Sequence, residues 1–338
     1  MIGSAAARYL SQGSDAVVLI GPDEPQGDWS AHDGVFASHY DQGRITRCLD
    51  GSLAWALWAT RSIAAYPEIE AQSGIRFHYR SGGVQVGFTT TDPNSNLNKA
   101  ERNALYLGTA YAKYTSEAFR PLYPELHFDD ELTVLHETGE AGYINPRALV
   151  AAQVKIAAAQ GTDVVRETVV ELDTKGNGVA LTTDGGQTIR AKQVLVAAGA
   201  WTEFLTGAKL DLLPMPRTIV LAQVDAAEAA RLKRMPTIIW YEGVNNPDVE
   251  GVYILPPIEY PDGNTYIKLG GALHHDDYHL MFLRRRYRSQ IARPFIDSTM
   301  TISTKPAAAA LTSKAGSGRE VQLKIWIGIT VKGAFSQS

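Results

Sequence analysis

The pattern of apolar positions divides the chain into helical and extended regions. Apolar residues at helical spacing predict helices over residues 53–72, 97–119 and 146–160. Pro146 stands at the favourable first position of the last helix, and Gly161 follows its end. Between and after these helices, shorter apolar runs bounded by Gly and Pro predict strands. The chain is therefore expected to combine helices with both buried and alternating strands.

The predicted strands change character along the chain. Residues 76–88 alternate around two glycines, which predicts a hairpin. The other predicted extended segments are residues 163–172, a hairpin over 179–191, a buried strand over 192–198, and antiparallel strands over 217–224, 237–241, 252–255 and 265–269. This order predicts an α/β fold with an α+β insertion: a nucleotide-binding domain built from separated segments and a second domain of antiparallel sheet.

The N-terminal residues match the end of a dinucleotide-binding turn, G-x-G-x-x-G. Gly3 takes the place of the third glycine, and Met1 and Ile2 fill the two variable positions before it. The third glycine lets a helix pack closely on a strand, and the helix N-terminus faces phosphates. The apolar run over residues 16–20 predicts a strand buried on both faces. The first strand and first two glycines do not occur before Met1, so we expect a chain truncated at its N-terminus.

An acidic residue is expected about 20 residues after the glycines, where it would hold ribose hydroxyls. That position is Gly21, and Asp23 and Glu24 follow it. Either carboxylate could reach the ribose. The alternative is that both are solvated turn residues beside Pro22 and Pro25.

Composition limits the class of protein. The 338 residues are 45% hydrophobic and 20% charged with net charge −4, which predicts a globular protein of two domains without nucleic-acid or membrane partners. The single cysteine, Cys48, excludes an intrachain disulfide and fits a reducing compartment. No apolar run reaches the length of a membrane span, and neither a signal peptide nor a C-terminal peroxisomal signal is evident, so a cytoplasmic location is expected.

One cluster of histidines and aspartates and one cluster of arginines are both interpreted without a functional role. The histidines and aspartates within residues 274–279 have the spacing of no standard ligand set, which favours a solvated loop or pocket edge, and we predict no metal site. The arginines at 284–286 and 288 are interpreted as the solvated face of a helix over residues 281–293.

Four stretches in order along the chain carry a resemblance to a family. They are residues 3–20, residues 38–47 (SHYDQGRITR), residues 142–149 (GYINPRAL) with 194–201 (VLVAAGAW), and residues 251–253 with 266–270 (YIKLG). Together they resemble the FAD-dependent amine and amino-acid oxidoreductases, the family of D-amino-acid oxidase and sarcosine oxidase, over residues 1 to about 297. The sarcosine-oxidase-like branch fits best.

The resemblance implies a division into domains. A Rossmann-like FAD-binding domain would comprise residues 1–52 and 142–210, and an antiparallel-sheet substrate domain residues 53–141 and 211–297. Residues 298–338 diverge from the family, although residues 321–331 alternate as a strand does.

The resemblance also implies roles for three cationic residues. Arg44 would lie near the flavin, and Arg47 would bind a substrate carboxylate through its fork of donors. The alternative for both is an ordinary surface arginine. Lys268 would lie over the flavin ring and promote its reoxidation by oxygen. An outward lysine remains the alternative, because strand alternation does not say which face meets the flavin.

Other family positions map onto this chain less specifically. Tyr253 would line the substrate pocket, or it is a strand aromatic; His274 would be a pocket histidine, with His275 as the alternative. The remaining cofactor contacts implied are Met1, Ile2 and Gly3 at the turn, Asp23 or Glu24, Val169 on the adenine side, Gly199 for close backbone approach, and Trp201 opening a short helix.

The implied reaction is hydride transfer to flavin from the carbon beside a secondary amine, or from an N-methyl amino acid, with reoxidation by O2 to H2O2. FAD would be held non-covalently, because Cys48 is not the C-terminal cysteine that some members use for attachment. Two alternatives stay open. One is a truncated member or pseudoenzyme that does not bind flavin stably, and the other is a dehydrogenase that passes electrons to another acceptor.

Overall fold

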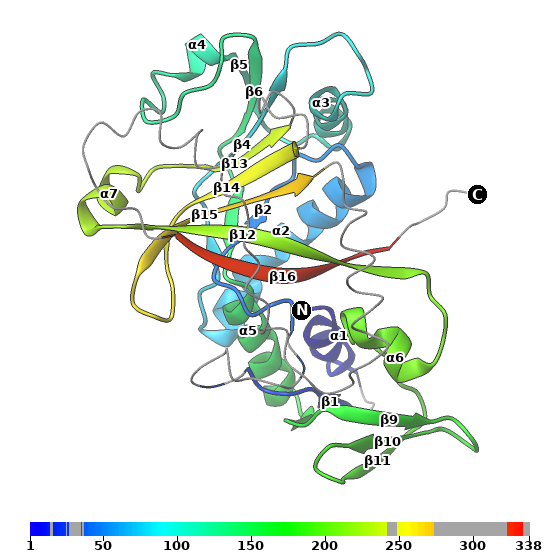
Figure 1. The fold of residues 1–338 in the computed structure, drawn as a ribbon. Helices are drawn as coiled ribbons and strands as arrows, with labels where there is room; N and C mark the ends of the chain where they lie inside the picture. Colours follow the sequence, from blue (N-terminus) through cyan, green and yellow to red (C-terminus); the bar gives the residue numbers. More distant parts are fainter. Residues whose placement is uncertain are drawn as a thin grey trace.

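An eight-stranded sheet forms the larger part of the fold (Figure 1). The computed structural model describes residues 1–13, 16–24, 26, 35, 37–241, 249–273 and 323–333. Within this part the strand order is β16-β12-β15-β14-β13-β4-β6-β5. The strands are β4 (Gly83–Phe88), β5 (Ala112–Thr115), β6 (Leu132–Glu137), β12 (Leu212–Val224), β13 (Thr237–Tyr241), β14 (Val249–Glu259), β15 (Thr265–Leu273) and β16 (Leu323–Gly333).

The large sheet joins two distant segments of the chain. Its neighbouring strands are antiparallel except at one place, where β13 runs parallel to β4 with Ile238 opposite Val84. The predicted antiparallel sheet is thus observed with one parallel pair at this junction. A parallel pair needs a long crossover connection, and here residues 89–236 supply it. Val84, Val134 and Ile238 meet in the core that covers the junction.

A smaller group of elements surrounds the N-terminus. Strand β1 (Val18–Ile20) pairs in parallel with β8 (Asp163–Val165), as a βαβ arrangement requires. The helical elements here are α1 (Ile2–Leu10), the 3-10 turn Gly199–Trp201 and α6 (Thr202–Thr206). One three-stranded sheet consists of β2 (Arg44–Thr46), β7 (Gly142–Ile144) and β3 (His78–Tyr79). A second consists of β9 (Val169–Asp173), β10 (Val179–Thr183) and β11 (Thr188–Ala191). Along the chain, helix α7 (Ala226–Arg231) comes directly after β12, a strand of the large sheet.

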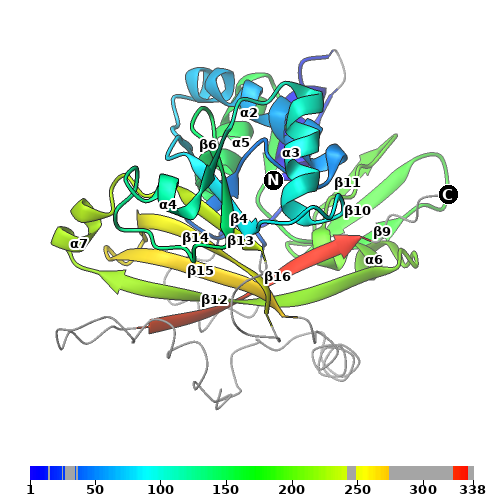
Figure 2. The same cartoon turned by 90° about the horizontal axis from the view of Figure 1, so that it is seen from above.

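Local sequence explains where the long helices begin and end. Ser52 caps α2 (Leu53–Ser73), and Gly74 ends it in the left-handed conformation at φ 66°. Asn145 caps α5 (Pro146–Ala159) by accepting the Ala148 N–H. The two helices share a buried core made of Ile63, Tyr66, Ile69, Phe77, Ile144, Leu149, Ala152 and Ile156. Figure 2 shows α2, α3 (Asn96–Leu107) and α5 together on one side of the large sheet.

The predicted helix over residues 97–119 was wrong beyond residue 107. Gly108 ends α3 in the left-handed conformation at φ 69°. The chain then forms β5 and the short helix α4 (Ser116–Phe119). Residues 76–88 also do not form a hairpin, because β3 pairs with β7 while β4 pairs with β6 and β13. Local alternation identified strand-forming residues here, but their partners come from elsewhere in the chain.

Three further strand predictions differ from the structure. Residues 192–198 do not form a buried strand, and Leu195 is 64% exposed. Strand β1 is not buried on both faces, since Val18 is 41% exposed. The predicted strand over residues 163–172 is divided into β8 and β9, which belong to different sheets. The hairpin over 179–191 is confirmed as β10 and β11.

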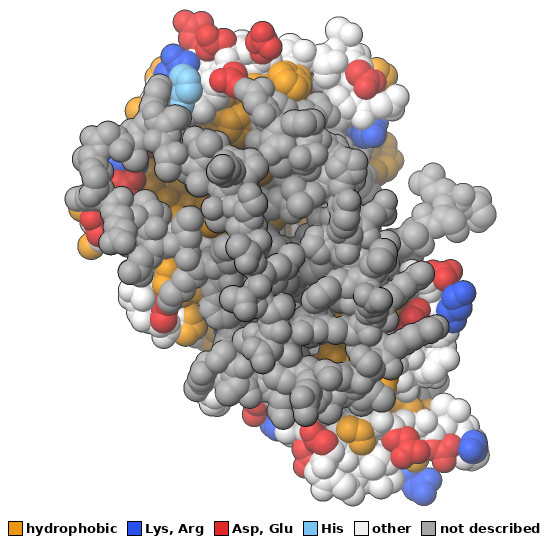
Figure 3. All heavy atoms as spheres, in the orientation of Figure 1, with side chains coloured by type: hydrophobic (Ala, Val, Ile, Leu, Met, Phe, Trp, Pro, Cys, Tyr) orange, Lys and Arg blue, Asp and Glu red, His pale blue; other side chains and the backbone are white. Residues whose placement is uncertain are grey.

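The strand predicted over residues 321–331 is confirmed as β16. Strand β16 pairs antiparallel with β12 along its whole length. The histidine cluster and the basic segment over residues 281–293 lie outside the described residues. Figure 3 shows charged side chains of both signs interspersed on the described surface, over α4 at one end and over β10 and β11 at the other. No helix in the described part of the chain is long and apolar enough to cross a membrane.

Candidate functional site

The loop that precedes β2 packs tightly on the large sheet. A β-carbon built on Gly43 would lie 2.5 Å from Ile258 Cδ1 and 2.8 Å from Leu255 Cδ2, both from β14. Only a glycine allows the loop backbone to come this close without displacing those side chains. The close approach brings residues 41–44 against the face of the sheet that carries Lys268.

Lys268 points into this loop from the middle of β15. Its side chain is buried, and its Nζ donates hydrogen bonds to Asp41 Oδ2 at 2.5 Å and to the Gly43 carbonyl oxygen at 2.9 Å. Burial lowers the pKa of Lys268 from its usual value, while the Asp41 carboxylate opposes that change. Lys268 is thus a buried residue and not an outward one, and it faces the loop that carries Arg44.

Arg44 lies between this loop and the start of α1. Its Nη1 is 3.7 Å from Met1 Sδ, and its Nη2 donates to the Ser38 carbonyl at 2.6 Å. Helix α1 has no side-chain cap and no acidic residue in its first turn. A nine-residue helix therefore presents uncapped N–H groups beside a guanidinium. Chemically, this is a place for an anionic group such as a pyrophosphate, and the residues present fit the cofactor that the motif implies.

The electrostatics around His39 support the same conclusion. Burial, and then the positive charges of the Met1 amine, Arg147 and Arg44, lower the pKa of His39 to about 4. Cations therefore converge on this part of the protein from α1, β2 and α5. Arg147 is paired with Glu24, so the Met1 amine and Arg44 are the charges here that favour binding of an anion.

The two acidic residues after β1 are both engaged by arginines. Glu24 Oε1 accepts a hydrogen bond from Arg147 Nε at 2.6 Å, in a half-buried ion pair with the start of α5. Asp23 forms an exposed pair with Arg166 at 2.9 Å. Both carboxylates follow the end of β1 by three or four residues, and Glu24 is the less exposed of the two.

Tyr253 joins the Lys268 cluster from the adjacent strand. The Lys268 Nζ lies 5.9 Å from the centroid of the Tyr253 ring. Tyr253 pairs with Gly270 across β14 and β15, and a β-carbon on Gly270 would lie 2.2 Å from the Tyr253 hydroxyl. Lys268, Tyr253 and Arg44 thus belong to one neighbourhood. His274, the other predicted pocket residue, lies outside the described residues.

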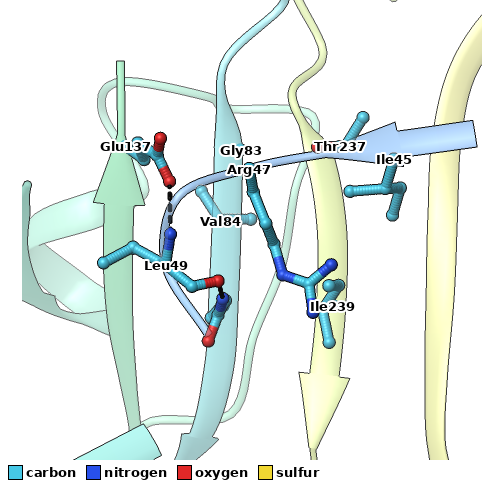
Figure 4. Close-up of a pocket in the computed structure, with 9 residues that line it drawn as sticks. Ile45, Arg47, Leu49, Gly83, Val84, Glu137, Thr237 and Ile239 are labelled. Atoms are coloured by element: carbon cyan, nitrogen blue, oxygen red, sulfur yellow. Dashed lines mark hydrogen bonds between the residues drawn. The ribbon is translucent and has the colours of Figure 1, made fainter. Parts of the chain in front are cut away.

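Arg47 points into a cavity between the segment that follows β2 and the paired strands β4 and β13 (Figure 4). Its Nη2 forms an ion pair with Asp50 at 2.7 Å, while its buried Nε has no hydrogen-bond partner among the described residues. Glu137 fixes the backbone beside it by accepting N–H bonds from Cys48 and Leu49 at 3.0–3.1 Å. The cavity is lined by Ile45, Arg47, Leu49, Gly83, Val84, Gln85, Glu137, Thr237 and Ile239. The guanidinium is therefore held beside Asp50, and its buried Nε–H is left without a partner among the described residues.

The remaining predicted cofactor residues lie in α1, in the 3-10 turn before α6 and in β9. A β-carbon on Gly3 would be 3.4 Å from Ala197 Cβ, so the start of α1 packs on the segment that leads to Gly199. Gly199 opens the 3-10 turn at φ 57°, and Trp201 ends it where α6 begins. Val169 begins β9 and pairs with Thr183 in the sheet of β9, β10 and β11.

Sequence reasoning missed the carboxylates and the tyrosine that organise these cations. Asp41 stands inside the quoted loop stretch, but no spacing rule links it to Lys268, which lies 227 residues later. No spacing rule predicts the contact of Tyr260 either, whose hydroxyl donates to Asp41 Oδ1 at 3.1 Å. Nor does one predict that Glu137 accepts the N–H groups of Cys48 and Leu49. Among the described residues, no group of three or more His, Cys, Asp or Glu side chains could hold a metal ion.

Comparison with solved structures defines the class of protein first. The fold matches NikD, described as an unusual amino acid oxidase essential for nikkomycin biosynthesis, with TM-score 0.61 and 18% identity over 81% of this chain and 67% of NikD. It also matches fructosyl amine:oxygen oxidoreductase (amadoriase I) from Aspergillus fumigatus, with TM-score 0.59 and 17% identity over 79% of this chain and 60% of that one. At these identities the likeness concerns the fold.

Sequence comparison then gives the family. The model of the DAO family, FAD dependent oxidoreductase, matches residues 1–304, and the chain belongs to this family. Monomeric sarcosine oxidase from Streptomyces avermitilis is 29% identical over 275 residues, which cover 77% of this chain. The matched region spans 65% of the length of that relative.

Proposed function

We propose that the chain is an FAD-dependent oxidase of a secondary amine or N-methyl amino acid, with O2 as the electron acceptor. The observation that carries the proposal is the buried Lys268, whose ammonium group enters the loop that holds Arg44 beside the start of α1. Family membership supports the redox chemistry, and the similarity to a sarcosine oxidase supports the amine substrate.

The chain's own residues would supply binding and charge. When bound, FAD contributes the hydride acceptor of the reaction. Met1, Ile2 and Gly3 at the uncapped start of α1, together with Arg44, would hold its pyrophosphate, and Glu24 or Asp23 would hold its ribose. We propose non-covalent attachment, because burial raises the pKa of the Cys48 thiol to about 11 and makes it a poor nucleophile.

Lys268 and Arg47 would act on the other reactants. The Lys268 ammonium would stabilise the negative charge that develops on oxygen as O2 is reduced. Arg47 would orient a substrate carboxylate through N–H donors that the pair with Asp50 does not use. Hydride transfer from a neutral amine requires no general base, so these two cations suffice for the proposed roles.

The first test is retention of the cofactor. The purified chain is mixed with FAD, freed of unbound FAD by gel filtration, and examined for the visible absorption of oxidised flavin. The proposal expects bound flavin that is bleached by an N-methyl amino acid or secondary amine without air and restored by O2 with release of H2O2. A colourless protein would overturn the proposed function. Bleaching by the amine without release of H2O2 would show a dehydrogenase that uses an electron acceptor other than O2.

A further inference from the structure

Lys268 occupies an apolar strand environment that cannot by itself support a charge. On β15 it lies between Leu221 of β12 and Leu255 of β14, which are 1% and 0% exposed, and Lys268 itself is 5% exposed. A buried amine in such surroundings loses its proton readily unless a counter-charge is present. Retention of the ammonium form therefore depends on the groups that face Nζ.

The groups around Nζ come from the loop and from β14. Asp41 and the Gly43 carbonyl accept its hydrogen bonds. Arg44 opposes its charge, and the ring of Tyr253 lies 5.9 Å away. Asp41 thus carries the one negative charge in direct contact with Nζ among the described residues.

The Asp41 carboxylate is itself fixed in place by other donors. Its Oδ1 accepts the Gln42 N–H at 2.8 Å and the Tyr260 hydroxyl at 3.1 Å, which leaves Oδ2 for Lys268. Burial tends to raise the pKa of Asp41, but Lys268, Arg44 and the Gln42 N–H outweigh it, and the pKa lies below its usual value. Asp41 is therefore ionised at neutral pH and can pair with the Lys268 ammonium there.

We infer that Asp41 is a positioning residue that keeps Lys268 charged and directs its ammonium group into the loop beside Arg44. The role of Lys268 toward oxygen rests on the proposed function; the dependence of its charge on Asp41 does not. Tyr260 and Gln42 act through Asp41, because their hydrogen bonds to its Oδ1 hold the carboxylate in the orientation that Lys268 needs.

The charge is tested on the apoprotein, without flavin. Lysines are labelled with carbon-13 at Cε, and the Lys268 resonance is identified by its loss in Lys268→Met. We expect Asp41→Asn to lower the pKa of Lys268 by about 2 or more, and Asp262→Asn to leave it unchanged. Asp262 is a fitting control because it accepts the Tyr266 hydroxyl at the turn before β15. An unchanged pKa for Lys268 in Asp41→Asn would overturn the inference.

The consequence for oxygen is tested on the flavin-loaded protein. In Asp41→Asn, reoxidation by O2 should fall at least tenfold as pH rises through the new pKa of Lys268, while flavin reduction by the amine changes less than twofold. In a Lys268→Arg background, Asp41→Asn should add no pH dependence, because a guanidinium stays charged without a carboxylate. An equal loss at every pH in both backgrounds would assign Asp41 a merely structural role and overturn the inference.

A second variant covers failure of Asp41→Asn to fold. Asp41→Glu keeps the negative charge but moves it by one methylene. Lys268 should then remain charged in the apoprotein while reoxidation by O2 slows severalfold at every pH. An unchanged reoxidation rate in Asp41→Glu, or loss of the Lys268 charge there, would contradict the positioning role. If FAD does not bind at all, the proposed function fails and the measurements on the apoprotein still decide whether Asp41 keeps Lys268 charged.

Discussion

The ring of Tyr253 lies directly over Gly270 on the neighbouring strand, and a β-carbon at residue 270 would be 2.2 Å from both Cζ and the hydroxyl oxygen. Gly270 and Lys268 are two residues apart on β15 and so share one face of the sheet. The glycine therefore makes room for an aromatic ring beside the buried lysine.

We expect Gly270→Ala to displace this ring and to lower the free energy of unfolding by about 1–3 kcal/mol, since the tightly packed site cannot accept another carbon. Chemical denaturation measures the loss. Gly21→Ala is the matched control, because a β-carbon there meets nothing within 4 Å. In a Tyr253→Ala background the same Gly270→Ala change should cost much less; an undiminished cost would show that the ring is not what excludes the side chain.

Lys268→Met should slow reoxidation of the reduced flavin by O2 about 10²–10³-fold, the range found when one group that stabilises a developing negative charge is removed. Reduction by the amine should change little, because that half-reaction places no negative charge on oxygen. Stopped-flow spectroscopy measures the two half-reactions separately. Lys113→Met is the control, since Lys113 forms a surface pair with Glu101. Equal slowing of both half-reactions in Lys268→Met would contradict a role toward oxygen.

Arg47→Ala should reduce kcat/KM for an N-methyl amino acid about 10–100-fold, the value of a hydrogen bond to a charged group. The same variant should leave the oxidation of a secondary amine without a carboxylate unaffected. Steady-state kinetics with the two substrates provide the comparison, and Arg102→Ala, an exposed arginine that donates to the Pro93 carbonyl, is the control. If both substrates lose activity to the same degree, Arg47 supports the fold through Asp50 and not the substrate carboxylate.

The pH dependence of stability should report the cation cluster near α1. Burial, the Met1 amine, Arg147 and Arg44 lower the pKa of His39 from 6.5 to about 4. The folded state then binds fewer protons than the unfolded state between these values. His39 therefore contributes its full stability above about pH 6.5 and loses that contribution as the pH falls toward about 4.

Urea denaturation at several pH values tests this expectation. His39→Gln should lose less stability than the wild type between about pH 7 and about pH 4. His127→Gln, at an exposed histidine, should follow the wild type. Parallel curves for His39→Gln and the wild type would show that His39 is not held neutral by its surroundings.

Local signals in the sequence were sufficient for several elements. Ser52 and Gly74 bound α2, Asn145 and Pro146 start α5, and the turn after Thr183 gives the β10–β11 hairpin. These features depend on residues within a few positions of one another. The predicted helix over 97–119 was wrong past residue 107 because Gly108 adopts a left-handed conformation and the next residues pair with β6.

The sequence by itself determined the family, the cofactor class and the cations Arg44, Arg47 and Lys268 as candidates, because each stands in a recognisable local stretch. Only the tertiary structure decided which of them meet. It brought Lys268 to Asp41 across 227 residues, directed Arg47 into a cavity that Glu137 also lines, and set β4 parallel to β13. Such contacts follow from how distant segments pack and bury charge together, and no periodicity along the chain encodes that packing.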